Sequence, residues 1–128
     1  MIVDSSALIA LLIREPGWER IAEALTCRPN PAIGAPTLTE TAIVLLAKGA
    51  PPSLLPALLR RTGIEVVAFT ERHADLAADA YARYGRGRHP ASLNYGDCMT
   101  YAVARLATAP LLFVGNDFSQ TDLEAALT

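Results

Sequence analysis

The chain of 128 residues carries a formal net charge of -2, and 52% of its residues are hydrophobic while only 19% are charged. This length and composition predict one domain over residues 1–128, large enough to bury a core without disulfide or metal staples, and they exclude a disordered chain. Typical domains carry about 25% charged residues. We therefore expect a partner to cover part of the apolar surface.

The chain carries no pattern typical of export or membrane insertion. Cys27 and Cys98 follow no metal-binding or redox spacing, and residues 1–4 form no basic leader. The longest apolar run, residues 7–13, is far shorter than the ~20 residues that span a bilayer. These features predict a cytoplasmic protein with reduced thiols and no membrane contact.

Hydrophobic patterning predicts strands that alternate with helices. The predicted strands are residues 2–3, 32–35, 64–69 and 111–114. The predicted helices are residues 7–13, 18–27, 37–48, 54–61, 70–84 and 95–107, the last of them capped by Asn94. Because parallel strands need crossover connections and these helices supply them, the predicted fold class is α/β, with a parallel sheet covered on both faces.

Four acids stand where such a fold would bring them together. Asp4 and Asp117 follow the first and last predicted strands, and ligands of open parallel sheets bind outside the carboxyl ends of strands. Glu40 and Asp97 lie in the first turns of two helices and can point toward the same edge. The sequence therefore predicts that four carboxylates converge.

Such a cluster requires a cation, because like charges a few ångströms apart repel one another. Carboxylates without nearby His or Cys suit Mg²⁺ or Mn²⁺ rather than Zn²⁺, and such sites commonly hydrolyse phosphodiesters. Without these four acids, the chain has nine acidic and eleven basic residues, so the rest of the molecule has a small positive net charge. A polyanionic substrate is therefore tolerated. Ser6 and Asn116 could hydrogen-bond a ligating carboxylate.

Each of these positions also has a structural interpretation, and the residues alone leave both open. Asp4 can cap a helix, Asp97 can favour a helix N-terminus, Asp117 can form an Asx-turn and Glu40 can be a solvated helix residue. Arg86 and Arg88, in the basic loop before residue 95, are candidates for RNA-backbone contact, and a merely solvated loop is the alternative.

Four segments of the chain together resemble the PIN-domain ribonucleases, most closely the VapC toxins of type II toxin–antitoxin modules. They are Met1–Ala7, Pro36–Glu40, Leu93–Cys98 and Leu112–Phe118, in the family's order and over essentially the whole chain. The resemblance implies a PIN-like three-layer α/β/α domain, with a short, mostly parallel sheet of four to five strands flanked by helices.

The resemblance also implies an activity. Asp4, Glu40, Asp97 and Asp117 match the acidic quartet of a Mg²⁺- or Mn²⁺-dependent endoribonuclease, and Asp4 and Asp97 match its surest metal ligands. Asn116 stands where some relatives carry an acid. The implied substrate is structured RNA such as tRNA or rRNA loops, and its cleavage would inhibit translation.

The partners implied by the resemblance are a second copy of the chain and a VapB-type antitoxin, which would cover the site and alone bind operator DNA. Two other functions remain open: a catalytically silent PIN-like binding module and a DNA-directed PIN nuclease. A phosphoryl-aspartate enzyme is disfavoured, because the only lysine, Lys48, lies at a helix end and Ser6 replaces the second acid of an Asp-x-Asp pair.

Overall fold

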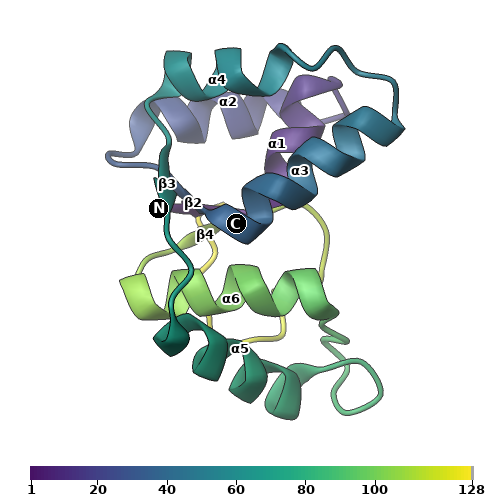
Figure 1. Ribbon diagram of the computed structural model, residues 1–128, viewed down its shortest axis with the longest axis vertical. Coiled ribbons are helices and arrows are strands. Elements are labelled where there is room, and N and C mark those ends of the chain that lie inside the picture. The colour runs from purple at the N-terminus through teal and green to yellow at the C-terminus, as the bar shows by residue number, and fades with distance from the viewer. Residues whose placement is uncertain (128) are drawn as a thin grey trace.

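The computed structural model describes residues 1–127, which form four short strands and six helices (Figure 1). The strands are β1 (Ile2–Val3), β2 (Ala32–Gly34), β3 (Glu65–Val67) and β4 (Leu111–Leu112). The helices are α1 (Ser5–Leu12), α2 (Trp18–Cys27), α3 (Ala35–Ala47), α4 (Leu54–Thr62), α5 (Glu71–Tyr84) and α6 (Tyr95–Ala107). The alternation predicted from the hydrophobic pattern is thus confirmed.

All four strands are parallel and lie in the order β3-β2-β1-β4. The chain builds outward from β1 through β2 to β3, and then α5 and α6 carry it across to β4 on the other side of β1. The direction of winding therefore changes between β1 and β4. In open parallel sheets this change of direction is where ligands bind, at the carboxyl ends of the strands.

Helices cover both faces of the sheet, as α/β architecture requires. Figure 1 shows α1 to α4 on one side and α5 with α6 on the other. Successive strand residues point to opposite faces, so Ile2 and Leu111 join the core under α6, whereas Val3 and Leu112 join the core under α1 to α4. Two-residue strands thereby supply both cores, and the predicted three-layer α/β/α class is confirmed.

The strands predicted at residues 64–69 and 111–114 are too long. β3 ends at Val67 because its partner β2 ends at Gly34, where α3 begins at once. Likewise β4 ends at Leu112, paired with Val3, because the chain turns into α1 immediately after Asp4. Apolar residues beyond these pairs have no strand to bond to, and they pack as loop instead.

Gly34 allows α6 to lie close against the end of β2. A Cβ atom at this position would stand 2.7 Å from Cγ2 of Val103, closer than such atoms approach one another. Val103 itself is almost fully buried. The missing side chain thus brings α6, which carries Asp97, tightly onto the sheet. Within residues 1–127, no helix is long and apolar enough to cross a membrane.

Candidate active site at the carboxyl edge of the sheet

Asp4 lies at the centre of the site, directly after β1, and is only 5% exposed. Its Oδ2 accepts hydrogen bonds from the Ser6 hydroxyl at 2.6 Å and the Ser6 amide at 3.1 Å, and its Oδ1 accepts one from the Thr100 hydroxyl at 2.7 Å. The amide bond makes Asp4 the N-cap of α1. The Asp4 side chain therefore both caps α1 and belongs to the acidic site.

Two buried threonines support Asp4, and the sequence analysis missed both. The Thr100 hydroxyl gives its proton to Asp4, so the Thr37 hydroxyl, 3.0 Å away, donates to Thr100. Thr37 and Thr100 are 1% and 0% exposed. The available signal was spacing, because each threonine lies three residues from an acid, Glu40 or Asp97, on the same helix, and residues three apart share a helix face.

Glu40 reaches the site from α3. Its Oε1 accepts a 2.7 Å hydrogen bond from the Ser5 hydroxyl, a partner that the sequence analysis also missed. The other side of the carboxylate lies against Gly96 in the first turn of α6, where an added Cβ would overlap Oε2. Gly96 thus leaves the space that lets Glu40 approach the helix carrying Asp97.

Asp97 lies at the start of α6 in a reciprocal capping box. Its Oδ2 accepts from the Asn94 amide at 3.0 Å, and its own amide donates to Oδ1 of Asn94 at 2.8 Å. Burial raises the pKa of Asp97 to about 6, the Asn94 hydrogen bond opposes that shift, and the charges of Asp117, Asp4 and Glu40 add to it. The other three predicted acids therefore all act on Asp97.

Asp117 and Asn116 lie on the exposed loop that follows β4. The start of this loop is tied to the site, because the Val114 amide donates a 3.0 Å hydrogen bond to the Ser6 hydroxyl. Ser6 therefore links the β4 loop to Asp4. Among the hydrogen bonds of residues 1–127, none joins the Asn116 side chain to an acid. The backbone carbonyl of Asn116 accepts from the Ser119 hydroxyl and amide.

The four acids do not form a preorganised metal-binding site. Within residues 1–127, no group of three or more His, Cys, Asp or Glu side chains is arranged to hold a metal ion. The carboxylates of Asp4, Glu40 and Asp97 turn instead to nearby hydroxyl and amide donors. Their chemistry still fits a hard divalent cation, because they are oxygen ligands whose mutual repulsion such a cation relieves.

The loop that carries Arg86 and Arg88 leads from α5 to the helix of Asp97. Backbone hydrogen bonds close it, from the Arg86 amide to the Leu93 carbonyl and from the Leu93 amide to the Tyr84 carbonyl. Both arginines are exposed, and the Arg88 guanidinium stands 5.9 Å from the ring centre of Tyr81. The two cations are thus presented on a closed loop that joins the first turn of α6.

A parallel α/β sheet with acidic side chains beyond its carboxyl edge is typical of one class of candidate hydrolases. The sequence matches the PIN domain family over residues 1–124. The chain belongs to that family and, within it, to the VapC ribonucleases of toxin–antitoxin systems. The family resemblance stated from the motifs is therefore confirmed.

Curated relatives and solved structures agree with this assignment. Ribonuclease VapC36 of Mycobacterium tuberculosis is 49% identical over 127 residues, covering 97% of this chain and 91% of the relative. Ribonuclease VapC of Mycolicibacterium smegmatis is 42% identical and covers 98% of both chains.

At the level of the fold, VapC20 of M. tuberculosis, described as a toxin that cleaves the sarcin-ricin loop, aligns with a TM-score of 0.76 at 19% identity over 95% of both chains. A toxin-antitoxin complex from Klebsiella pneumoniae aligns with a TM-score of 0.71 at 19% identity over 94% of this chain and 92% of that one.

Proposed function

We propose that this chain is a toxin that hydrolyses phosphodiester bonds in structured RNA, such as tRNA or rRNA loops, with Mg²⁺ or Mn²⁺, and so inhibits translation. The observation that carries the proposal is that the charges of Asp4, Glu40 and Asp117 all raise the pKa of Asp97, which lies at the start of α6. Relatives named ribonucleases at 42–49% identity support the same reaction class.

Asp4 and Asp97 would hold the cation, with Glu40 and Asp117 completing its surroundings directly or through water. When bound, a divalent ion supplies positive charge to the scissile phosphate and lowers the pKa of a water molecule. Such a charge also favours the ionised form of Asp97, whose pKa of about 6 reflects burial and three neighbouring acids. The donor set thus suits the ion that the chemistry requires.

The chain's own residues orient the individual acids. Thr100 and Ser6 hold both Asp4 oxygens, Ser5 holds Glu40, and the Asn94 capping box holds Asp97 at the start of α6. Ser6 and Asn116 are proposed as outer partners of the site. Water would attack phosphorus and the 3′-oxygen would leave, which gives 5′-phosphate and 3′-hydroxyl ends.

Arg86 and Arg88 are the proposed contacts to the RNA backbone. They project from the loop that enters α6 just before Asp97, so phosphates next to the scissile bond would lie beside them. Arginine suits this task because its planar guanidinium can bind two phosphate oxygens together.

The proposed partners are a VapB-type antitoxin and a second copy of the chain, and operator DNA would be bound only through the antitoxin. Large apolar side chains remain exposed, among them Ile43 and Leu46 on α3 and Tyr95 on α6. A groove of about 440 Å³ between α3 and α4 is lined by leucine, proline and alanine side chains, including Leu38, two residues before Glu40. An apolar segment of the antitoxin would bind in this groove. We place the protein in the cytoplasm, as one PIN domain over residues 1–128.

The test is cleavage of end-labelled total cellular RNA by purified protein freed of antitoxin, with Mg²⁺ or Mn²⁺ and with EDTA as control. The matched variant is Asp97→Asn, because an asparagine oxygen can still accept from the Asn94 amide and keep the capping box. We expect discrete cuts that require both the metal and Asp97, with 5′-phosphate ends. Single-stranded and duplex DNA are run in parallel.

Three results would contradict the proposal. Ends with 2′,3′-cyclic phosphate would make the RNA 2′-hydroxyl the nucleophile, which the acidic site does not need. Full cleavage by Asp97→Asn would remove this acid from the reaction. Cleavage of DNA without cleavage of RNA would favour a DNA-directed PIN nuclease, and Mn²⁺ binding without cleavage of either would favour a silent binding module.

A further inference from the structure

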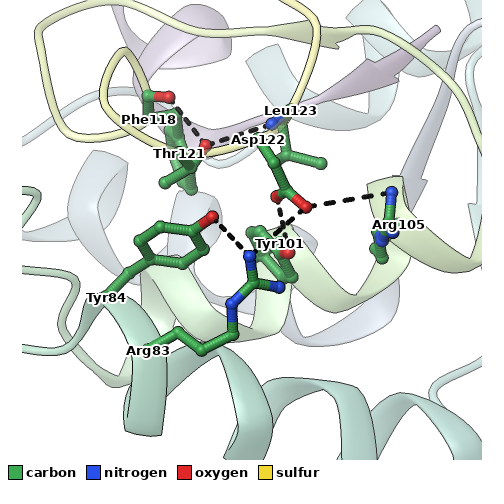
Figure 2. Close-up of polar contacts among 8 residues, drawn as sticks. All are labelled: Arg83, Tyr84, Tyr101, Arg105, Phe118, Thr121, Asp122 and Leu123. Atoms are coloured by element: carbon green, nitrogen blue, oxygen red, sulfur yellow. Dashed lines mark hydrogen bonds and ion pairs between the residues drawn. The ribbon is translucent and has the colours of Figure 1, made fainter.

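Residues 113–121 carry Asp117 away from the sheet and are fixed at both ends. At the near end, the Val114 amide is bonded to Ser6, which in turn is bonded to Asp4. At the far end, Asp122 is held by side chains of α5 and α6 (Figure 2). The far attachment has no part in the proposed chemistry.

Tyr101 makes the strongest of these contacts. Its hydroxyl donates a 2.7 Å hydrogen bond to Oδ1 of Asp122, and its side chain is buried. The guanidinium groups of Arg83 and Arg105 stand 3.7 and 3.9 Å from Oδ2, at distances and exposures where ion pairs contribute little alone. A buried phenol needs a hydrogen-bond partner, so Tyr101 fixes the position of Asp122.

Packing and hydrogen bonds within the loop connect Asp122 to the residue next to Asp117. Phe118, the residue after Asp117, is 2% exposed and packs edge-on against Phe113. The Thr121 hydroxyl donates 2.7 Å to the Phe118 carbonyl and accepts from the Leu123 amide (Figure 2). Hydrogen bonds and packing therefore continue from Asp122 back to the residue beside Asp117.

The same helix carries both the acid and the attachment. Tyr101 lies four residues after Asp97 on α6, and residues four apart lie one above the other on a helix face. We propose that the Tyr101–Asp122 hydrogen bond is a positioning device that holds the Asp117 loop in register with Asp97. The inference rests on the proposed function, and it makes Tyr101 and Asp122 positioning residues for metal binding and cleavage.

The test is a double-mutant cycle between Tyr101→Phe and Asp117→Asn. Mn²⁺ binding is measured by electron paramagnetic resonance without RNA, and cleavage is measured on the site mapped in total RNA. If Tyr101 acts through Asp117, Tyr101→Phe lowers cleavage about tenfold and weakens Mn²⁺ binding in the native background. In the Asp117→Asn background the same change has no further effect.

Two further variants separate positioning from general stability. Tyr84→Phe removes a neighbouring buried hydroxyl that accepts from Arg83 at 2.8 Å, and it should leave Mn²⁺ binding and cleavage unchanged. Asp122→Asn keeps an oxygen for Tyr101, so it should retain more activity and Mn²⁺ affinity than Asp122→Ala. Thermal unfolding of each variant checks that the fold persists.

The outcomes are distinguishable. Equal losses from Tyr101→Phe in both backgrounds, or no loss in either, would overturn the positioning role while leaving the nuclease intact. If the native protein neither binds Mn²⁺ nor cleaves RNA, the proposed function itself fails, and the positioning role fails with it.

Discussion

Two neighbouring residues of α6 hold two aspartates in very different surroundings. Thr100 and Tyr101 each donate a 2.7 Å hydrogen bond, to Asp4 and Asp122 respectively. Asp4 is buried, and the groups bonded to it are neutral hydroxyls and an amide. The Asp122 side chain is one-third exposed and has two arginines beside it.

The comparison teaches which carboxylate is available for a cation. Asp122 already has positive partners, and its place in the fold is structural. Asp4 is oriented by groups that carry no charge, and within residues 1–127 no salt bridge involves Asp4, Glu40, Asp97 or Asp117. An acid held in place by neutral donors is thus the better metal ligand, because it is fixed without being neutralised.

Asp4→Asn should cause the largest effect of any single change. An amide group would place N–H donors against either Ser6 or Thr100, which themselves donate to Asp4. We expect cleavage to fall about 1000-fold, which corresponds to ~4 kcal/mol of lost charge stabilisation, and the free energy of unfolding to fall by about 1–3 kcal/mol. Single-turnover kinetics and urea unfolding measure the two losses.

The control is Asp122→Asn, which leaves one oxygen for Tyr101 and should lower cleavage less than tenfold. Equal losses of cleavage in the two variants would contradict the comparison.

Thr100→Val should come next. It removes the hydroxyl that orients Asp4 while keeping the shape of the buried side chain. Loss of an outer partner of a metal ligand typically costs about 10–100-fold in metal affinity or activity, so Mn²⁺ titration should show a loss in that range. Thr100→Ser, which keeps the hydroxyl, is the matched control. An unchanged Mn²⁺ affinity in Thr100→Val would show that Asp4 needs no orientation.

Gly96→Ala should lower cleavage about tenfold although alanine favours helix by ~1 kcal/mol over glycine. The new methyl group would occupy the space of the Glu40 carboxylate and push it away from Asp97. Circular dichroism checks that α6 persists. In a Glu40→Ala background the same substitution should have no effect on cleavage, and an additional loss there would point to a cause other than Glu40.

The two regions should also respond to pH with opposite signs. The pKa of Asp97 rises from 3.8 to about 6 on folding, mainly through burial, so its charge destabilises the metal-free fold above pH 6. For Asp122, burial alone would raise the pKa, but Tyr101, Arg105 and Arg83 outweigh it and lower the pKa. Asp122 therefore stabilises the fold at neutral pH, and that contribution is lost as the pH falls through its folded pKa.

Urea unfolding in EDTA measures this difference. At pH 7.5, Asp97→Asn should raise the free energy of unfolding by about 1–2 kcal/mol after allowance for solvent screening, and Asp122→Asn should lower it by less than ~1 kcal/mol. At pH 3.5 the Asp97→Asn difference should shrink toward zero, because native Asp97 is then protonated. The Asp122→Asn difference should shrink only at still lower pH, because the folded pKa of Asp122 lies below its usual value. Changes of the same sign at pH 7.5 would contradict the contrast.

The smallest effect should come from the two exposed arginines of the loop before α6. Replacing Arg86 and Arg88 by alanine should weaken RNA binding several-fold at moderate salt and reduce the slope of log affinity against log salt by about 1–2. Arg60→Ala with Arg61→Ala, a pair of exposed arginines at the end of α4, removes the same charge elsewhere. Equal changes in slope for both pairs would mean that only net charge matters.

The sequence predicts where the acids lie better than what holds them. The four acids could be placed because strand ends and helix starts follow from hydrophobic patterning and turn residues. Thr100 reaches Asp4 across 96 residues of chain, and Tyr101 reaches Asp122 across 21. Both contacts depend on the rotation of α6 about its axis, which packing at Gly34 and Val103 sets in the folded protein. Local sequence carries little information about such a rotation.

The two edge strands of the sheet differ, because residues 124–126 cover β4 but not β3. Leu111 donates its amide to the Glu124 carbonyl and accepts from the Ala126 amide, so the outer side of β4 is bonded to residues 124–126. The opposite border is β3, where Val66 is 49% exposed. An uncovered border strand invites pairing with a strand from another molecule. Unwanted strand addition should therefore begin at β3, and a lysine at position 66 is the simplest protection against aggregation.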